Sequence, residues 1–424
     1  MSICGKRAYK LLSALSFERL AGSPEEEKAA DLLVSELTTF GLQGAKEAFE
    51  VTNYAINTAK LKVVAPYEAE YTVTGIGRSG CTPDGGLEAD FLYVGEAAAA
   101  DLLEAQGKIV MVNGRTSVET FERLVAAKVA GIVSISGNVY DNPADTDLQL
   151  IRIHEGHLQH GIIPGVSLRA VDALAMLEQG ACRVKLELCQ EELVQTSHNV
   201  VCEIPGSCHP EEIIAFTAHY DSVFFSGGAN DNAAGSVILM EIARYFAAKP
   251  PSRTLRFIWC GAEEYGLLGS FDYVKKHEEE MSKFKLVINV DVAGGYIGRN
   301  VTMVTGAQGL ADVVDYMCKE IGVAMETRTG VSSSDSVPFA EVGIPGVNFI
   351  RGGAPIHNRH DQAKYISPAR LAELAEVTLL FSQRVVNAKV FPVKRELPEN
   401  IKKDLIRYLQ NWRGAKMEIP AALK

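Results

Sequence analysis

Residues 213–221 read IIAFTAHYD, a short apolar run that leads directly into a histidine and an aspartate. Two further apolar runs, at 255–260 and 286–290, also lead into acidic residues. Short apolar runs separated by segments of helical length are typical of the parallel strands of α/β proteins. The pattern therefore predicts an α/β fold with a mostly parallel, doubly wound sheet and helices on both faces.

Two further segments have the pattern of helices. Residues 25–41 repeat apolar side chains at steps of three and four after a Ser-Pro pair, and Gly41 ends the pattern. Residues 233–248 have the length and spacing of a second helix. Residues 58–189 differ, because their strand-like and helix-like runs carry no cluster of catalytic residue types. The predicted parts are a main domain at 1–57 and 190–390, a smaller inserted β-rich α/β domain at 58–189, and a helical tail at 391–424.

Charge and composition exclude several classes of partner. The 424 residues carry a formal net charge of -11, which argues against nucleic acid and anionic membranes as partners. No apolar stretch is long enough to span a bilayer, and the first residues lack a signal-peptide pattern, so we expect a cytoplasmic protein. The eight cysteines lack Cys-x-x-Cys spacing, and we expect free, buried thiols. The oligomeric state stays open between a monomer and a homodimer.

One segment of fewer than fifty residues concentrates side chains that bind metals. It contains His219, Asp221, Asp231, Glu263 and Glu264, and no cysteine is needed to complete the set. Histidine and carboxylate ligands suit a hydrolytic zinc centre better than a structural zinc site, which favours thiolates. These residues follow predicted strands, whose carboxyl ends form the usual site in open α/β sheets.

The spacing of these residues indicates different roles. His219 and Asp221 share one side of an extended segment, so Asp221 can orient the imidazole. The adjacent acids Glu263 and Glu264 would repel each other unless one neutralises a cation and the other holds a proton. One of them is then a metal ligand and the other a general base.

A complete site needs more ligands than this segment supplies. Asp291 follows the third predicted strand, and the late segment 356–361 offers His357 and His360. With His357, five ligands fit two metal ions that share one carboxylate. These ligands are His219, Asp231, Glu264, Asp291 and His357.

The order of these motifs resembles peptidase family M28, the dinuclear zinc aminopeptidases. The matching motifs are His-x-Asp, Asp-Asn-Ala-x-Gly, Gly-x-Glu-Glu-x-Gly, Asn-x-Asp and a late His-x-x-x-Asp. Segments 107–112 and 163–167 resemble the protease-associated domain inserted in many such enzymes. The resemblance implies a zinc-dependent exopeptidase fold and hydrolysis of the N-terminal peptide bond of peptides with a free amino terminus.

The resemblance also implies a role for each matching residue. His219 and Asp291 would bind one Zn²⁺, Glu264 and His357 the other, and Asp231 would bridge the two, with Co²⁺ or Mn²⁺ as other occupants. Asp221 would support His219, and Glu263 would take a proton from the attacking water and deliver it to the leaving amine. Asn358 stands where the family usually has threonine or serine, which keeps His360 as an alternative ligand.

Other functions on the same fold stay open. Dipeptidases, carboxypeptidases and glutaminyl cyclases resemble the family too, although the five-ligand set argues against a single-zinc cyclase. A binding module that has lost hydrolysis would be expected to lack ligands or the general base. A separate cluster, His154, His157 and His160, is expected to lie in a solvated loop, because Gly156 and Gly161 break the helix that would align it.

Overall fold

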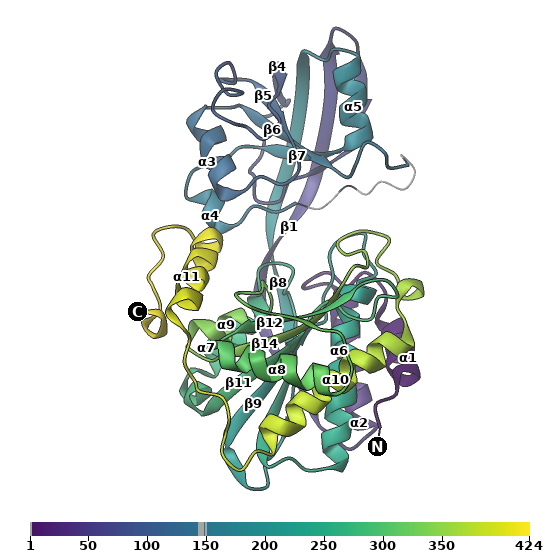
Figure 1. The fold of residues 1–424 in the computed structure, drawn as a ribbon. Coiled ribbons are helices and arrows are strands. Elements are labelled where there is room, and N and C mark those ends of the chain that lie inside the picture. The colour runs from purple at the N-terminus through teal and green to yellow at the C-terminus, as the bar shows by residue number, and fades with distance from the viewer. Residues whose placement is uncertain (1, 143–147, 149–150) are drawn as a thin grey trace. The chain divides into compact units, whose positions relative to one another are not determined.

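The computed structural model describes residues 2–142, 148 and 151–424 (Figure 1). The chain forms two compact units, each assembled from separate segments. The first unit comprises Met1–Val51, Gln195–Tyr408 and Glu418–Lys424, and the second comprises Thr52–Val194 and Leu409–Met417. The predicted domain boundaries, and the likeness of the insert to a protease-associated domain, stay predictions.

A mixed sheet forms the centre of the first unit. Its strand order is β13 (Glu326–Thr329), β12 (Arg299–Thr305), β14 (Gly346–Gly352), β11 (Phe284–Val290), β9 (His209–His219), β10 (Arg253–Cys260) and the last part of β8 (Arg183–Ile204). The four strands β14, β11, β9 and β10 run parallel. Strand β12 runs antiparallel to β14 and parallel to β13, and β8 runs antiparallel to β10. The prediction of a mostly parallel sheet is confirmed.

Helices cover both faces of this sheet, as the alternating burial of β9 shows. Ile214 and Phe216 pack into a core with α1 (Gly5–Leu15), α2 (Pro24–Thr38), α6 (Ala234–Ala248), α8 (Gln308–Glu320) and α10 (Pro368–Val386). Ile213 and Ala215 pack into a second core with α7 (Leu268–Lys276) and α9 (Val337–Glu341). Because both faces are buried, the parallel strands read as continuous apolar runs. Every residue of β10 is buried.

The helix predicted at 25–41 begins and ends close to the expected positions. Ser23 caps α2 by accepting a hydrogen bond from the Glu26 backbone N–H, and Pro24 occupies the first turn. The helix ends at Thr38 rather than at Gly41. The chain then turns through Gly41, whose φ of 81° suits glycine.

The second unit has its own parallel sheet. Strands β4 (Leu87–Tyr93), β5 (Ile109–Val112), β6 (Gly131–Ser136) and β7 (Gly165–Arg169) are parallel, with β3 (Val73–Gly75) antiparallel to β7 and the first part of β8 antiparallel to β4. Strand β1 (Gly44–Ala65) pairs with β2 (Ala69–Tyr71). The helices here are α3 (Val118–Ala126), α4 (Glu155–Leu158) and α5 (Ala170–Glu178), and α11 (Glu399–Arg413) divides between the two units at Tyr408. The first unit also contains short helices at Glu278–Lys283, Ala363–Tyr365 and Ala421–Leu423, and a kinked turn at Ala229–Ala233.

Two expectations about surface groups are wrong. His157 is buried, with Nε2 3.1 Å from the Thr116 carbonyl oxygen, and the His154 ring packs on Trp412 at 4.2 Å. The cluster is therefore not a solvated loop, because contacts distant in sequence outweigh the two glycines. All cysteines are free, but Cys81, Cys182, Cys189 and Cys208 are exposed rather than buried. No helix in the described part of the chain is long and apolar enough to cross a bilayer.

Candidate metal centre

The carboxyl ends of the parallel strands bring the predicted ligands together. His219 is the last residue of β9, Asp291 follows β11, and Glu264 follows β10. His357 lies in the loop after β14, the fourth strand of the parallel group. The site therefore occupies the edge of the sheet at which ligands bind in open α/β folds.

Asp231 lies at the centre of the cluster, between the two histidines. Its Oδ1 is 3.0 Å from His219 Nε2, and its Oδ2 is 3.1 Å from His357 Nε2. His219 Nε2 is also 3.3 Å from Asp291 Oδ1, and His357 Nε2 is 3.2 Å from Glu264 Oε2. Each oxygen of one carboxylate thus faces a different histidine, and each histidine faces one further acid.

Glu263 lies on the same edge of the cluster as Asp291. Ligand atoms of His219, Glu263 and Asp291 fall within 4.8 Å of one another, as do those of His219, Asp231 and Glu264. These distances alone therefore do not decide whether Glu263 is a metal ligand or a general base. His360, the alternative to His357, is exposed, whereas His357 contacts two acids of the cluster.

Asp221 has a structural task that its spacing from His219 does not reveal. Its Oδ1 lies 3.4 Å from His219 Nδ1. The same carboxylate accepts the backbone N–H of Glu263 at 3.0 Å and that of Glu264 at 3.1 Å. One fully buried side chain therefore positions the histidine and both glutamates at once.

A chain of hydrogen bonds orients Asp291. Ser334 Oγ donates to Asp291 Oδ2 at 2.6 Å, and Asn289 Nδ2 donates to Ser334 Oγ at 2.8 Å. Thr217 Oγ1 in turn donates to Asn289 Oδ1 at 2.7 Å. These groups come from β9, β11 and the segment before α9, so the position of Asp291 depends on three elements of the fold.

The loop that carries Asp231 is held by Asp361 and by Arg19. The Asp361 carboxylate accepts the backbone N–H groups of Asn230 and Asp231 at 2.6 and 3.0 Å. The buried guanidinium of Arg19 donates to the carbonyl oxygens of Gly227 and Gly228, both at 2.7 Å. Arg19 also donates to the carbonyl oxygen of Tyr220, beside His219.

Glu26, on α2, holds the loop of the two glutamates from the other side. It accepts hydrogen bonds from the Ala262 backbone N–H at 3.1 Å and from Ser197 Oγ at 2.8 Å. Arg19 and Glu26 lie in no motif. The contacts of Arg19 with Tyr220, Gly227 and Gly228 span 201 to 209 positions, and those of Glu26 with Ser197 and Ala262 span 171 and 236 positions. No sequence signal marks either residue.

The charges of the cluster favour a bound cation. Burial alone would lower the pKa of His219, but the carboxylates of Glu263 and Asp291 raise it well above its usual range. Burial would also lower the pKa of His357, yet its hydrogen bonds to Asp231 and Glu264 raise it to about 10. Protons on the two histidines thus offset several buried acids. A metal ion would replace these protons, because it binds the neutral imidazole.

Unpaired oxygens provide an independent test of the metal fit. Among the described residues, Glu264 Oε1 and Asp291 Oδ1 are buried without a hydrogen-bond partner. The single Nε2–H of His219 cannot serve both Asp231 and Asp291. A buried carboxylate oxygen without a donor is costly unless a cation contacts it. Two imidazoles and several carboxylates are a ligand set that Zn²⁺ accepts, so the residues fit the metal.

Three residues that flank or belong to the cluster have strained backbones. Ala262 precedes Glu263 and has a φ of 51°, Val292 follows Asp291 and has a φ of 60°, and His357 has a φ of 56°. Left-handed conformations are uncommon for residues with a side chain and tend to gather at functional sites.

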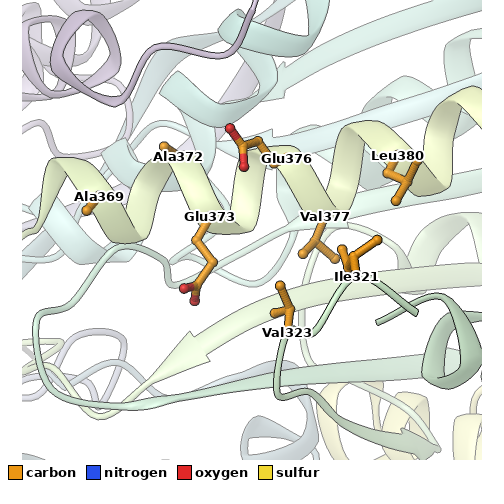
Figure 2. Close-up of a pocket in the computed structure, with 8 residues that line it drawn as sticks. All are labelled: Ile321, Val323, Ala369, Ala372, Glu373, Glu376, Val377 and Leu380. Carbon is orange, nitrogen blue, oxygen red and sulfur yellow. The ribbon is translucent and has the colours of Figure 1, made fainter. Parts of the chain in front are cut away.

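A surface pocket elsewhere in the first unit is a different feature. It has a volume of about 650 Å³ and lies between α10 and the segment after α8 (Figure 2). Figure 2 shows Glu373 and Glu376 on α10, with Ile321 and Val323 facing the helix. None of the predicted metal ligands lines this pocket.

Comparison with known proteins identifies the domain that carries the cluster. Residues 199–382 match the sequence model of peptidase family M28. This part of the chain is an M28 peptidase domain. The match includes every predicted ligand and Glu263, and the whole M28 domain lies within the first unit.

Relatives of the M28 domain extend the similarity to most of the chain. The chain is 29% identical over 429 residues to aminopeptidase YwaD of Bacillus subtilis, covering 94% of this chain and 88% of that protein. It is 28% identical to carboxypeptidase Q of Mus musculus, covering 82% and 78%. The solved structure of BSAP, a zinc aminopeptidase from Bacillus subtilis, superposes with a TM-score of 0.78 at 26% identity, covering 94% of this chain and 99% of that one.

Proposed function

We propose that the protein is a zinc-dependent aminopeptidase that hydrolyses the N-terminal peptide bond of peptides, with two metal ions in the cluster. The observation that carries the two-ion site is the placement of Asp231, whose two oxygens face different histidines. The similarity to aminopeptidases over nearly the whole chain supports the reaction.

The contacts suggest how the ligands divide between the ions. His219 and Asp291 would hold one ion, His357 and Glu264 the other, and Asp231 would bridge them, since each pair is already in contact. Zn²⁺ is the expected metal, and Co²⁺ or Mn²⁺ suits the same ligands. When bound, such ions act as Lewis acids on the scissile carbonyl and lower the pKa of water towards ~7.

Glu263 is the proposed general base. Burial raises the pKa of its carboxyl well above the usual range, and Glu264 and Asp291 add to the rise while His219 opposes it. A carboxylate with a raised pKa is a stronger proton acceptor. Asp221 fixes its backbone beside Glu264, so Glu263 is placed to take a proton from the attacking water and to deliver it to the departing amine.

The proposal is tested by metal analysis together with a substrate panel. Purified protein is analysed for bound metal, and the same sample is assayed with amino-acid anilides and with the matching amino-blocked anilides. Two metal ions per chain and cleavage of the free amino termini alone are the expected results. Cleavage of blocked substrates would refute the aminopeptidase specificity, and one ion per chain would refute the dinuclear site.

The variant Glu263→Gln separates the base from the ligands. We expect kcat to fall by about 10² to 10⁴-fold while the metal content stays at the wild-type level. Glu279→Gln, at an exposed glutamate in the same unit, is the matched control and should leave both quantities unchanged. Loss of metal from Glu263→Gln would instead make Glu263 a ligand, as its place beside His219 and Asp291 also allows.

Carboxypeptidase specificity is the second candidate, because carboxypeptidase Q matches 82% of this chain. The two specificities differ in the free terminus that the substrate must present. Peptides blocked at one end or the other therefore distinguish them. Hydrolysis that survives amino-terminal acetylation and is abolished by carboxyl-terminal amidation would favour the carboxypeptidase.

A further inference from the structure

Two exposed cysteines lie close together in the second unit. Cys81 lies in the segment between β3 and β4, and Cys189 lies on β8. Both are free and exposed to solvent. They are 108 positions apart in the sequence, so their approach is a product of the fold and not of local spacing.

The backbone contacts on either side bring the two cysteines together. The Thr82 backbone N–H donates to the Leu188 carbonyl oxygen at 2.9 Å, and the Leu188 N–H donates to Thr82 Oγ1 at 3.0 Å. The Gln190 N–H, two residues after Leu188, donates at 3.3 Å to Sγ of Cys81, the residue before Thr82. Cys189 lies between Leu188 and Gln190, the two residues that contact the Cys81–Thr82 segment.

This arrangement suits a disulfide. Residues opposite each other on adjacent extended segments have Cα atoms about 4.5–5.5 Å apart, which is within the range that a disulfide accepts. Cys81 Sγ also donates to the Gln190 carbonyl oxygen at 3.4 Å, so this sulfur lies against the backbone of the residue next to Cys189.

We propose that Cys81 and Cys189 form a reversible thiol–disulfide site that reacts with small-molecule disulfides. One cysteine thiolate attacks a sulfur of the small disulfide and releases one small thiol. The second cysteine then attacks the mixed disulfide and releases the other. The two cysteine sulfurs are oxidised by two electrons and lose two protons, and the small disulfide is reduced to two thiols that take them up. The new bond ties the β3–β4 segment to β8.

The two thiols differ in reactivity. Desolvation raises the pKa of the Cys189 thiol, and the neighbouring Cys81, Glu191 and Asp84 add to the rise. A thiol with a raised pKa has less thiolate at neutral pH and attacks more slowly. The Gln190 N–H that donates to Cys81 Sγ also stabilises a thiolate on Cys81. Cys81 is therefore the expected first attacker, and Cys189 the residue that closes the bond.

The test uses the full chain with Cys182→Ser and Cys208→Ser, so that Cys81 and Cys189 are the exposed thiols left among the described residues. The protein is incubated with oxidised glutathione, the reaction is stopped with acid, and the intact mass is measured. We expect a loss of about 2 Da, for two hydrogen atoms, with a Cys81–Cys189 link in the peptide map and reversal by dithiothreitol.

A second variant checks the order of attack and the identity of the pair. Adding Cys189→Ser should abolish the loss of mass and leave a single glutathione adduct on Cys81. Unchanged mass, separate glutathione adducts on both cysteines, or a link between other cysteines would overturn the proposal. The readout is independent of metal content and of peptidase activity, so it does not depend on the proposed function.

Discussion

Replacing Arg19 with methionine should destabilise the first unit more than any exposed substitution. The guanidinium is fully buried, and burial lowers its pKa to about 10, so it stays charged at neutral pH. Among the described residues, its hydrogen bonds go only to backbone carbonyl oxygens, those of Leu15, Phe17, Tyr220, Gly227 and Gly228. Methionine preserves most of the aliphatic volume and removes all of these donors.

The size of the effect follows from the groups that are left behind. Each buried carbonyl that loses its donor costs about 1–3 kcal/mol, although water and the relief of a buried charge recover part of this sum. The nearby Asp221, Asp361 and Asp231 carboxylates also lose a compensating charge. Removing one member of a buried charge network costs about 3–5 kcal/mol, which lowers the unfolding midpoint of a domain of this size by about 6–20 °C.

Scanning calorimetry with and without added Zn²⁺ measures this change. Arg19→Lys keeps the charge but has at most three donors, so it should recover part of the loss. Arg370→Met is the matched control, because Arg370 is half exposed and pairs with Glu373 on the same helix. That pair contributes less than about 0.5 kcal/mol. An Arg19→Met midpoint equal to that of the control would refute the reasoning.

Three further predictions concern the metal and the second unit. Asp361→Asn should weaken Zn²⁺ affinity by about 10–100-fold in a competition titration, because one carboxylate oxygen that holds the Asp231 loop is lost; unchanged affinity would contradict this. Chelation should lower the unfolding midpoint of the first unit, and added Zn²⁺ should restore it by mass action. Burial lowers the pKa of His154 to about 3, against about 6.5 when unfolded, so the unfolded state binds the extra proton between these values. The free energy of unfolding of the second unit should therefore decrease as the pH is lowered through this window, by up to about 1.4 kcal/mol per pH unit. His154→Phe keeps a ring against Trp412 and should flatten the pH dependence of the unfolding midpoint.

The parts of the fold that could be predicted are those with a local signature. The runs before His219 and Asp291 are apolar without alternation, because parallel strands covered on both faces bury every side chain. Once strands are placed, the meeting of their carboxyl ends follows from the topology. For this reason the ligand cluster is visible in the sequence before any contact is known.

The groups that position the ligands could not be predicted in the same way. Arg19 binds carbonyl oxygens, which every residue type possesses, so the sequence at the other end of the contact has no distinguishing mark. Glu26 is a further case, since it reads as an ordinary acid in the first turn of a helix. His154 shows the converse, because a local glycine signal is overruled by packing against Trp412, more than 250 positions later.

The left-handed residues beside the ligands have a consequence for engineering. Ala262, Val292 and His357 adopt a conformation that costs a residue with a side chain about 1 kcal/mol or more relative to glycine. A search for thermostable variants would therefore favour glycine at Ala262 and Val292. The same change would free the chain on either side of the catalytic acids. Selection for heat resistance and selection for turnover should thus pull these two positions in opposite directions.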